Sequence, residues 1–215
     1  MAIVAADLAD AGFPVFRYDR RGIGDSTGTN VGFLSSEADM TAAVAAFRAA
    51  APRMSRIVGF GNCDAASALA LFGHGAGIDR VLLANPWTIE DRDDLPPVAA
   101  IRAHYAGRLL SPAAWLRLVR GGIDIGKAVR GLAKIARHAP GTSNGLAPQV
   151  VTAIAAWGTN ASVVLARGDA TAIAYRAVAG SLPSTTLDTD SHSFARGADK
   201  VALNAILVDL LGSTH

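Results

Sequence analysis

One strand-to-helix turn constrains the fold of this chain more than any other feature of its sequence. The apolar run Ile57–Phe60 predicts a short buried strand, and the small residues at 65–71 predict a helix. Between them lies Gly61-x-Cys63-x-Ala65, which has the spacing of a nucleophile elbow, G-x-S-x-G, with cysteine at the centre. The residues on either side of such a turn nearly touch, so they must be small. We therefore expect Cys63 to project from the turn at the start of a helix.

The thiol of Cys63 has two chemical interpretations. At a helix N-terminus the helix dipole favours negative charge, so we expect a lowered thiol pKa and a place for an oxyanion. The backbone N–H of Asp64 is then one oxyanion donor. A lone cysteine is otherwise most often a buried thiol without a chemical role. The strand, turn and helix around Cys63 favour the nucleophile.

The composition is that of one globular α/β domain with an insertion, for which 215 residues are sufficient. With 51% hydrophobic and 18% charged residues, the chain does not belong to the disordered class. A net charge of +2 gives no sign of a nucleic-acid partner, and a single cysteine excludes an internal disulfide. Neither a signal peptide nor a membrane span is predicted, so we expect a cytoplasmic protein.

Strand and helix patterns alternate in both end regions of the chain. Apolar runs bounded by turn residues predict further strands at 15–19, 81–85, 161–167 and 185–188. Helical patterns predict helices at 1–11, after Ser36 and at 198–211. Ser36 is the expected N-cap of its helix, and Met40, Val44 and Phe47 form the core-facing stripe. The alternation predicts an α/β fold with a mostly parallel sheet and helices on both faces.

The alternation stops after Asn85-Pro86-Trp87. Residues 89–158 show helical patterns broken by proline and glycine, and we expect a helical cap over a core of residues 1–88 and 159–215. Between positions 102 and 137 the only acid is Asp124. The basic residues there are Arg102, Arg108, Arg117, Arg120, Lys127, Arg130, Lys134 and Arg137. This excess indicates either a solvated lid or attraction of an anionic substrate or membrane surface.

The glycine-punctuated loop at residues 20–28 also has two interpretations. A phosphate cradle is disfavoured, because the G-x-G-x-x-G spacing is absent and no helix follows at once. A turn held by hydrogen bonds of Asp25 and Ser26 to the backbone is favoured.

Two more reactive side chains directly follow predicted strands. Asp169 comes after the strand at 161–167, and His192 alone among five histidines lies in a loop after a strand. Because the carboxyl ends of parallel strands meet at one edge of a sheet, both are expected to converge on Cys63. The chain order of nucleophile, acid and histidine is that of the α/β-hydrolase triad. We predict a Cys-His-Asp triad that uses no cofactor and no metal.

A family resemblance extends over the whole chain. It rests on Gly12–Val15, Tyr18–Ser26, Gly61–Ala65, Asn85–Trp87, His104–Tyr105, Arg108–Pro112 and Trp115. On these residues the chain resembles an α/β hydrolase and, more narrowly, the exosortase A system-associated hydrolase 1 family. The loop and the elbow are shared with many hydrolases, whereas the Asn-Pro-Trp motif and the cap motifs are narrower.

The resemblance implies a cytoplasmic bacterial hydrolase encoded with exopolysaccharide and protein-sorting machinery. It supplies no substrate and no oligomeric state. We expect a small-molecule ester, thioester or acyl-carrier substrate that Cys63 attacks. The side chains considered for substrate binding are Asn62, Trp87, His104 and Tyr105.

The resemblance also implies that strands are missing. In α/β hydrolases the loop before the first helix donates a second oxyanion N–H, whereas this chain begins inside that helix. We expect the first three strands and that loop to be absent, as in an N-terminally truncated sequence. A gap should then separate the strands at 15–19 and 57–60. The alternative is that these two strands pair directly and that the site is incomplete.

Two other classes of function remain as alternatives. One is a non-catalytic α/β-hydrolase-like protein that binds an acyl or glycan intermediate or a protein partner. The other, a haloperoxidase- or dehalogenase-like enzyme, is disfavoured because it requires serine or aspartate at position 63.

Overall fold

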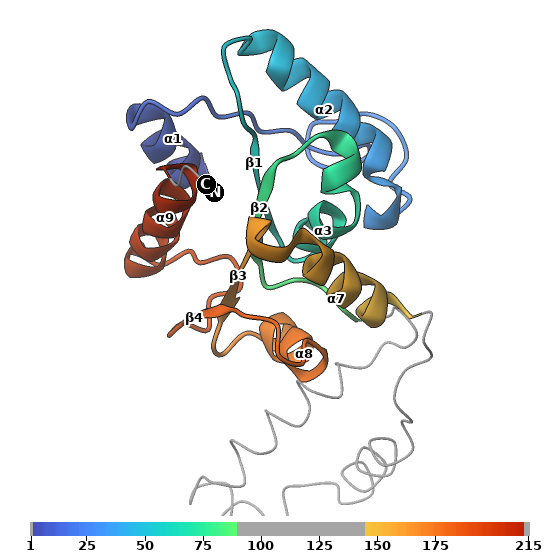
Figure 1. Cartoon of the computed structure of the whole chain (residues 1–215), viewed down its shortest axis with the longest axis vertical. Helices are drawn as coiled ribbons and strands as arrows, with labels where there is room; N and C mark the ends of the chain where they lie inside the picture. Colours follow the sequence, from blue (N-terminus) through green and yellow to red (C-terminus); the bar gives the residue numbers. More distant parts are fainter. Residues whose placement is uncertain (1, 90–144, 213–215) are drawn as a thin grey trace, which may run out of the picture.

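The computed structural model describes residues 2–89 and 145–212, and Figure 1 traces their path. Four parallel strands form one sheet in the order β1-β2-β3-β4. Their bounds are Val58–Asn62 for β1, Arg80–Ala84 for β2, Ala161–Ala166 for β3 and Thr185–Leu187 for β4. The predicted parallel α/β sheet is therefore confirmed, with β2, β3 and β4 within one residue of the expected bounds and β1 within two.

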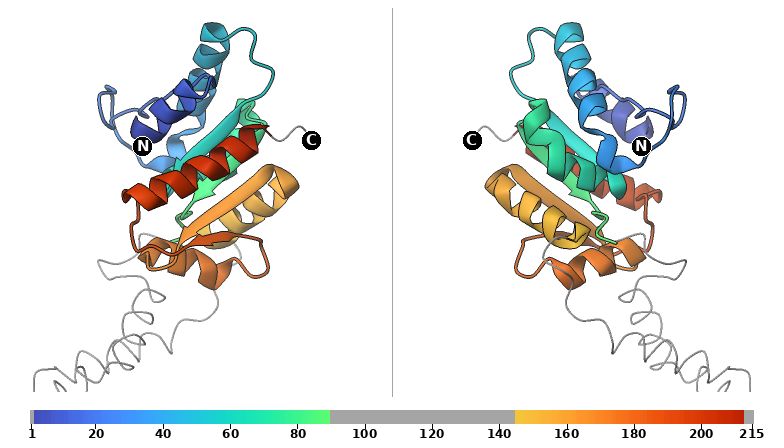
Figure 2. Two further views of the ribbon diagram at one scale, coloured as in Figure 1. Left: turned by 90° about the vertical axis from the view of Figure 1, so that its left-hand side faces the viewer. Right: turned by 90° about the vertical axis from the view of Figure 1, so that its right-hand side faces the viewer.

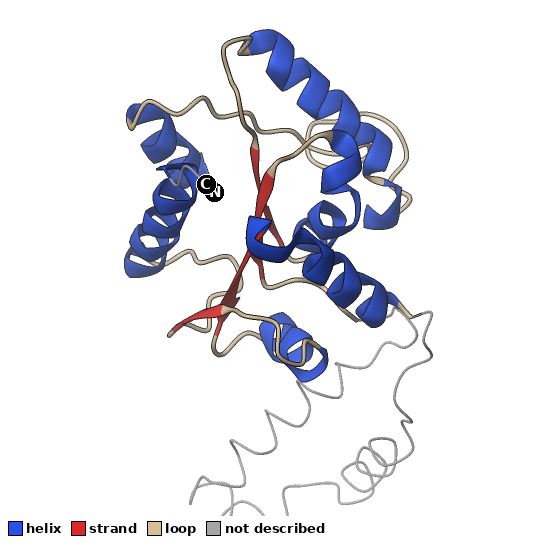
Figure 3. Ribbon diagram, in the orientation of Figure 1, coloured by secondary structure: helices blue, strands red, loops and turns tan. Residues whose placement is uncertain are grey.

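Helices cover both faces of this sheet, as Figures 2 and 3 show. One face carries α1 (Ala2–Asp10) and α9 (Gly197–Gly212). The other face carries α2 (Glu37–Ala50), α3 (Asp64–Ala76), α7 (Leu146–Trp157) and α8 (Ala170–Val178). Two short 3₁₀ helices, Phe33–Ser35 and Gly158–Asn160, precede α2 and β3.

The two central strands divide their side chains between two cores. Val81 and Leu83 of β2 pack in the core beneath α3 and α7, whereas Leu82 and Ala84 pack in the core beneath α1 and α9. Successive residues of a strand point to opposite faces, and both faces are covered, so every one of these positions is apolar. The helix stripe follows the same logic, because Met40 and Val44 of α2 are buried in the first core.

The strand predicted at 15–19 is wrong. Residues 13–20 have no strand structure, and within the described residues β1 pairs only with β2. An apolar alternation becomes a strand only when a neighbouring chain supplies hydrogen bonds, and β1 offers none to this segment. Val15 and Phe16 are accordingly exposed. Direct pairing between 15–19 and 57–60 is therefore wrong as well.

Helix α7 changes the predicted domain boundary. Residues 146–157 were expected in the cap, but Val150, Ile154 and Trp157 are buried in the core beneath α3. The indole of Trp157 donates a hydrogen bond to the carbonyl of Ala70 in α3 at 2.9 Å. The rest of the predicted cap, residues 90–144, lies outside the described residues. None of the helices that the structure describes is long and apolar enough to cross a membrane.

The loop between α1 and α2 is a turn of the favoured kind, organised mainly by Asp19. The Ser26 hydroxyl donates to the carbonyl of Asp19 at 2.6 Å, and the amide of Asp25 donates to its carboxylate at 3.3 Å. Ser36 does occupy the N-cap of α2, but its side chain makes no capping hydrogen bond. Its hydroxyl is buried without a partner among the described residues.

Candidate active site

The turn between β1 and α3 has the geometry of a nucleophile elbow. Cys63 adopts φ 62° and ψ −124°, a backbone conformation that residues with a side chain rarely adopt. A Cβ atom at Gly61 would lie 2.7 Å from the carbonyl carbon and oxygen of Ala65. Glycine is therefore required at position 61 by the same close approach that the sequence predicted. The predicted turn geometry is confirmed.

Backbone hydrogen bonds hold this strained residue in place. The amide of Cys63 donates to the carbonyl of Ala84 at 2.9 Å, which ties the elbow to the end of β2. The carbonyl of Cys63 accepts from the amides of Ala66, Ser67 and Trp87 at 3.1, 3.2 and 3.3 Å. The hydroxyl of Ser67 then donates to the carbonyl of Trp87 at 2.7 Å. Trp87, considered for substrate binding, thus supports the elbow through its backbone.

The environment of the thiol corrects one prediction. Burial raises the pKa of Cys63 above its ordinary value, and the nearby carboxylates of Asp64 and Asp169 raise it further. Hydrogen bonds from the Asp64 amide and from the Thr171 side chain oppose this rise in pKa without cancelling it. The lowered pKa that the helix N-terminus suggested is therefore wrong for this structure. Desolvation of this half-buried thiol outweighs the backbone N–H of Asp64 that the helix N-terminus supplies.

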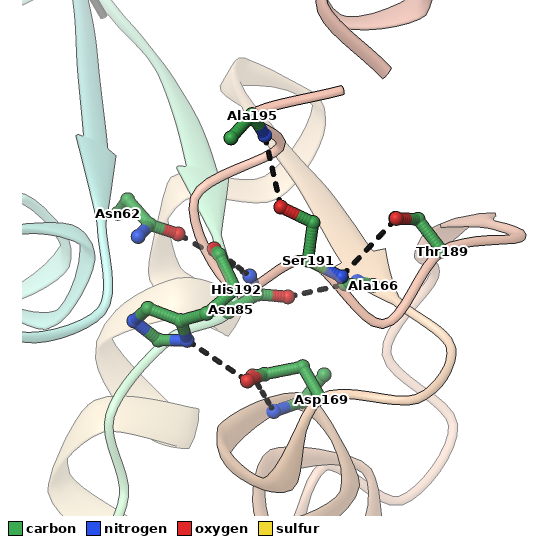
Figure 4. Close-up of polar contacts among 9 residues, drawn as sticks. Asn62, Asn85, Ala166, Asp169, Thr189, Ser191, His192 and Ala195 are labelled. Carbon is green, nitrogen blue, oxygen red and sulfur yellow. Dashed lines mark hydrogen bonds and ion pairs between the residues drawn. The ribbon is translucent and has the colours of Figure 1, made fainter. Parts of the chain in front are cut away.

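The predicted acid and histidine are in contact. Nδ1 of His192 lies 2.9 Å from Oδ1 of Asp169, as Figure 4 shows. The other oxygen of Asp169 accepts the amide of Ala172 at 3.0 Å, so this carboxylate is also the N-cap of α8. The side chain of His192 is 42% exposed, whereas that of Asp169 is 9% exposed. The geometry is that of a buried acid orienting an accessible imidazole.

Cys63 stands at the same edge of the sheet without a bond to His192. The elbow follows β1, Asp169 follows β3 and His192 follows β4, and these strands are parallel. Asp169 acts on the thiol electrostatically, which places the two groups in one environment. In the part of the chain that the structure describes, however, no hydrogen bond joins the thiol to His192. Catalytic hydrogen bonds often form only when substrate is bound.

Residues that the sequence did not single out surround the predicted ones. Arg20 donates to the Asp64 carboxylate at 3.2 Å, so the turn after α1 contacts the residue that follows Cys63. Thr171 contacts the thiol from the first turn of α8. The sequence could have indicated Thr171 through Asp169, because an aspartate directly after a strand is often the N-cap of the next helix, and Thr171 lies in the first turn of that helix.

The remaining predicted site residues have mixed outcomes. Asn62 uses its side-chain oxygen to accept a 3.3 Å hydrogen bond from Asn85. His104 and Tyr105 lie outside the described residues. Within residues 2–89 and 145–212, no group of three or more His, Cys, Asp or Glu residues is arranged to hold a metal ion.

A parallel sheet, a strained elbow after its first strand, and a carboxylate and a histidine after its last two strands together define an α/β-hydrolase fold. No family model and no curated protein sequence matches the chain. Among solved structures, a hydrolase from Pseudomonas aeruginosa PA01 is 18% identical, with a TM-score of 0.42, and the match covers 92% of this chain and 79% of the other. The enol-lactonase from Burkholderia xenovorans LB400 is also 18% identical, with a TM-score of 0.44 and coverages of 92% and 80%.

Proposed function

We propose that this chain is a hydrolase that cleaves an ester or a thioester through an acyl-enzyme on Cys63. The observation that carries this proposal is the 2.9 Å contact between Asp169 and His192 at the edge where the strained elbow presents Cys63. A buried carboxylate on Nδ1 leaves Nε2 of the imidazole as the basic atom. Packing alone does not require a histidine, an aspartate and a strained cysteine after three parallel strands.

The raised pKa of the thiol favours one chemical route over another. A thiol that is protonated at neutral pH must lose its proton as it attacks, so His192 acts as general base rather than as partner of a resting thiolate. The sulfur–carbon bond forms, the carbonyl electrons move to oxygen, and Nε2 takes the proton. The oxyanion collapses, the bond from the carbonyl carbon to the leaving group breaks, and the imidazolium donates this proton to the departing oxygen or sulfur. Water, deprotonated by His192, then attacks the acyl carbon. The carbon–sulfur bond breaks, the acid is released, and the imidazolium returns a proton to the sulfur of Cys63.

The N-terminus of α3 is suited to hold the oxyanion. The amide of Asp64 lies in the first turn of α3 and is directed toward the Cys63 side chain. The carboxylate of Asp64 opposes this role, because it adds negative charge beside the thiol. Its ion pair with Arg20 offsets that charge.

The finer parts of the proposal rest on the sequence alone. We infer a cytoplasmic enzyme linked to an exosortase and exopolysaccharide system. Its substrate would be a small-molecule ester, thioester or acyl carrier, and its basic cap could contact an anionic membrane surface.

A second candidate function has an observation of its own. The raised thiol pKa and the lack of a bond between Cys63 and His192 in the described structure also suit a non-catalytic protein that binds an acyl or glycan intermediate or a protein partner.

Hydrolysis of model substrates tests the proposal. p-Nitrophenyl acetate and an N-acetylcysteamine thioester are incubated with the wild type, Cys63→Ala and His192→Ala. The control is His74→Ala, since His74 stacks on Trp157 and lies in the last turn of α3, whereas the elbow precedes its first turn. We expect both site variants to lose at least about 100-fold in kcat/KM while the control retains activity. Equal rates for the wild type and Cys63→Ala would reject the proposal in favour of the binding protein.

A further inference from the structure

The buried side chain of Asn85 joins the three segments that carry the candidate site. It follows β2 and is fully buried, with 0% exposure. Its amide nitrogen donates to the carbonyl oxygen of His192 at 2.9 Å and to the side-chain oxygen of Asn62 at 3.3 Å. Its amide oxygen accepts from the backbone N–H of Ala166 at 2.8 Å. Figure 4 shows this side chain between the elbow strand, the end of β3 and the histidine loop.

Asparagine suits this position for reasons of both chemistry and backbone. The three contacts need two N–H donors and one acceptor on one short planar group, and among side chains of this size only asparagine offers both. Asn85 also has φ 43°, in the left-handed region that asparagine tolerates better than most residues. Aspartate would keep the acceptor and lose both donors. Leucine would fill the volume and leave three polar groups without these partners, of which the Ala166 N–H is buried.

Each contact that Asn85 makes lies within three residues of a reactive group. Asn62 precedes Cys63, Ala166 lies three residues before Asp169, and the third contact is to His192 itself. The histidine loop has a second, buried support, because the hydroxyl of Thr189 donates to Asp199 at 2.8 Å.

We infer that Asn85 is a positioning residue, which sets the distance and orientation of the His192 loop relative to the elbow and to the strand that carries Asp169. Asn85 touches no reacting atom. It acts through the backbone of His192, and its effect on reactivity rests on the proposed function. Its effect on the placement of the imidazole does not.

The test uses Asn85→Gly, which removes the side chain and accepts the left-handed backbone, with the exposed Asn160→Gly as matched control. Nitrogen-15 NMR of the His192 ring measures the share of the Nδ1–H tautomer bound to Asp169. Alkylation of Cys63 by iodoacetamide measures reactivity. We expect Asn85→Gly to lose the single Nδ1–H signature and to slow alkylation at least tenfold, while the control matches the wild type. An unchanged His192 signature in a folded Asn85→Gly protein would overturn the inference.

The two arms separate this inference from the proposed function. Suppose that the wild type shows the Nδ1–H signature but that His192→Ala does not change the alkylation rate of Cys63. The proposed enzyme is then rejected, and the NMR result alone decides whether Asn85 positions His192.

If Asn85→Gly does not fold, hydrogen exchange in the wild type decides. The side-chain amide protons of Asn85 should then exchange at least tenfold more slowly than those of Asn160, and should become exposed in the same opening as the His192 ring. Equal exchange at Asn85 and Asn160, or separate openings, would contradict the inference.

Discussion

The carboxylate of Asp169 holds Nδ1 of His192 at 2.9 Å with one oxygen and caps helix α8 with the other. One side chain therefore fixes the imidazole and the helix that brings Thr171 to the thiol. The arrangement couples the orientation of the base to the local stability of α8.

Asp169→Asn should separate these two roles. Its amide oxygen can still accept the Ala172 N–H, so the cap persists and the free energy of unfolding should change by less than about 1 kcal/mol. The imidazole loses its carboxylate and its fixed tautomer, so kcat should fall by roughly 10²- to 10⁴-fold. Urea melts and ester hydrolysis measure the two effects. Asp169→Ala should lose about 1 kcal/mol more, and full activity in Asp169→Asn would show that the pair is structural only.

Gly61→Ala should disrupt the elbow. The new Cβ would stand 2.7 Å from backbone atoms of Ala65, and backbone cannot move aside as a flexible side chain can. We expect a loss of about 3 kcal/mol or more in the free energy of unfolding. Gly197→Ala is the control, because its Cβ would meet nothing within 4 Å in the described structure, and it should be neutral or slightly stabilising. Equal denaturation midpoints for the two variants would contradict the close approach.

The charge of Asp64 should contribute to the raised pKa of Cys63, in addition to burial. Because this carboxylate disfavours the thiolate, Asp64→Asn should lower the thiol pKa and speed alkylation at pH 8. Arg20→Gln exposes the same charge and should raise the pKa. Alkylation rates against pH, with Arg21→Gln as a control that pairs with Asp39 instead, measure both shifts. Shifts of the same sign in Asp64→Asn and Arg20→Gln would refute this account.

Alkaline pH should destabilise the fold through Tyr175. Burial raises the pKa of Tyr175 to about 12, and its hydroxyl has no hydrogen-bond partner among the described residues. Below the ordinary tyrosine pKa near 10, the raised pKa of Tyr175 does not lower the free energy of unfolding. That free energy falls as the pH rises from about 10 toward 12. Tyr175→Phe should therefore be neutral or stabilising by about 1 kcal/mol at pH 7, and should flatten the alkaline loss. Thermal melts from pH 7 to 11 measure the stability at neutral pH and its loss at alkaline pH. If Tyr175→Phe loses as much stability at alkaline pH as the wild type, another group causes the loss.

The sequence was most informative where local chemistry alone determines the structure. The Gly61-x-Cys63-x-Ala65 turn needs only small residues and a strand before a helix, and the structure forms it. The contact between Asp169 and His192 followed from the topology, since both come after neighbouring parallel strands.

Features that depend on distant neighbours could not be predicted in this way. The segment at 15–19 alternates like a strand, but strand formation depends on a hydrogen-bonding neighbour that a pattern cannot reveal. The thiol pKa depends on burial and on Asp169, more than 100 positions away along the chain. The role of Asn85 was hidden for the same reason, because its three contacts come from separate strands and loops.

The most direct test of the central claim is the intact mass of the protein, measured within the first turnover of an activated acyl donor such as p-nitrophenyl acetate. The account predicts one acetyl adduct on the peptide that contains Cys63, formed at least about 100-fold more slowly in His192→Ala. Hydrolysis without an adduct on Cys63, or an adduct that forms equally fast without His192, would contradict it.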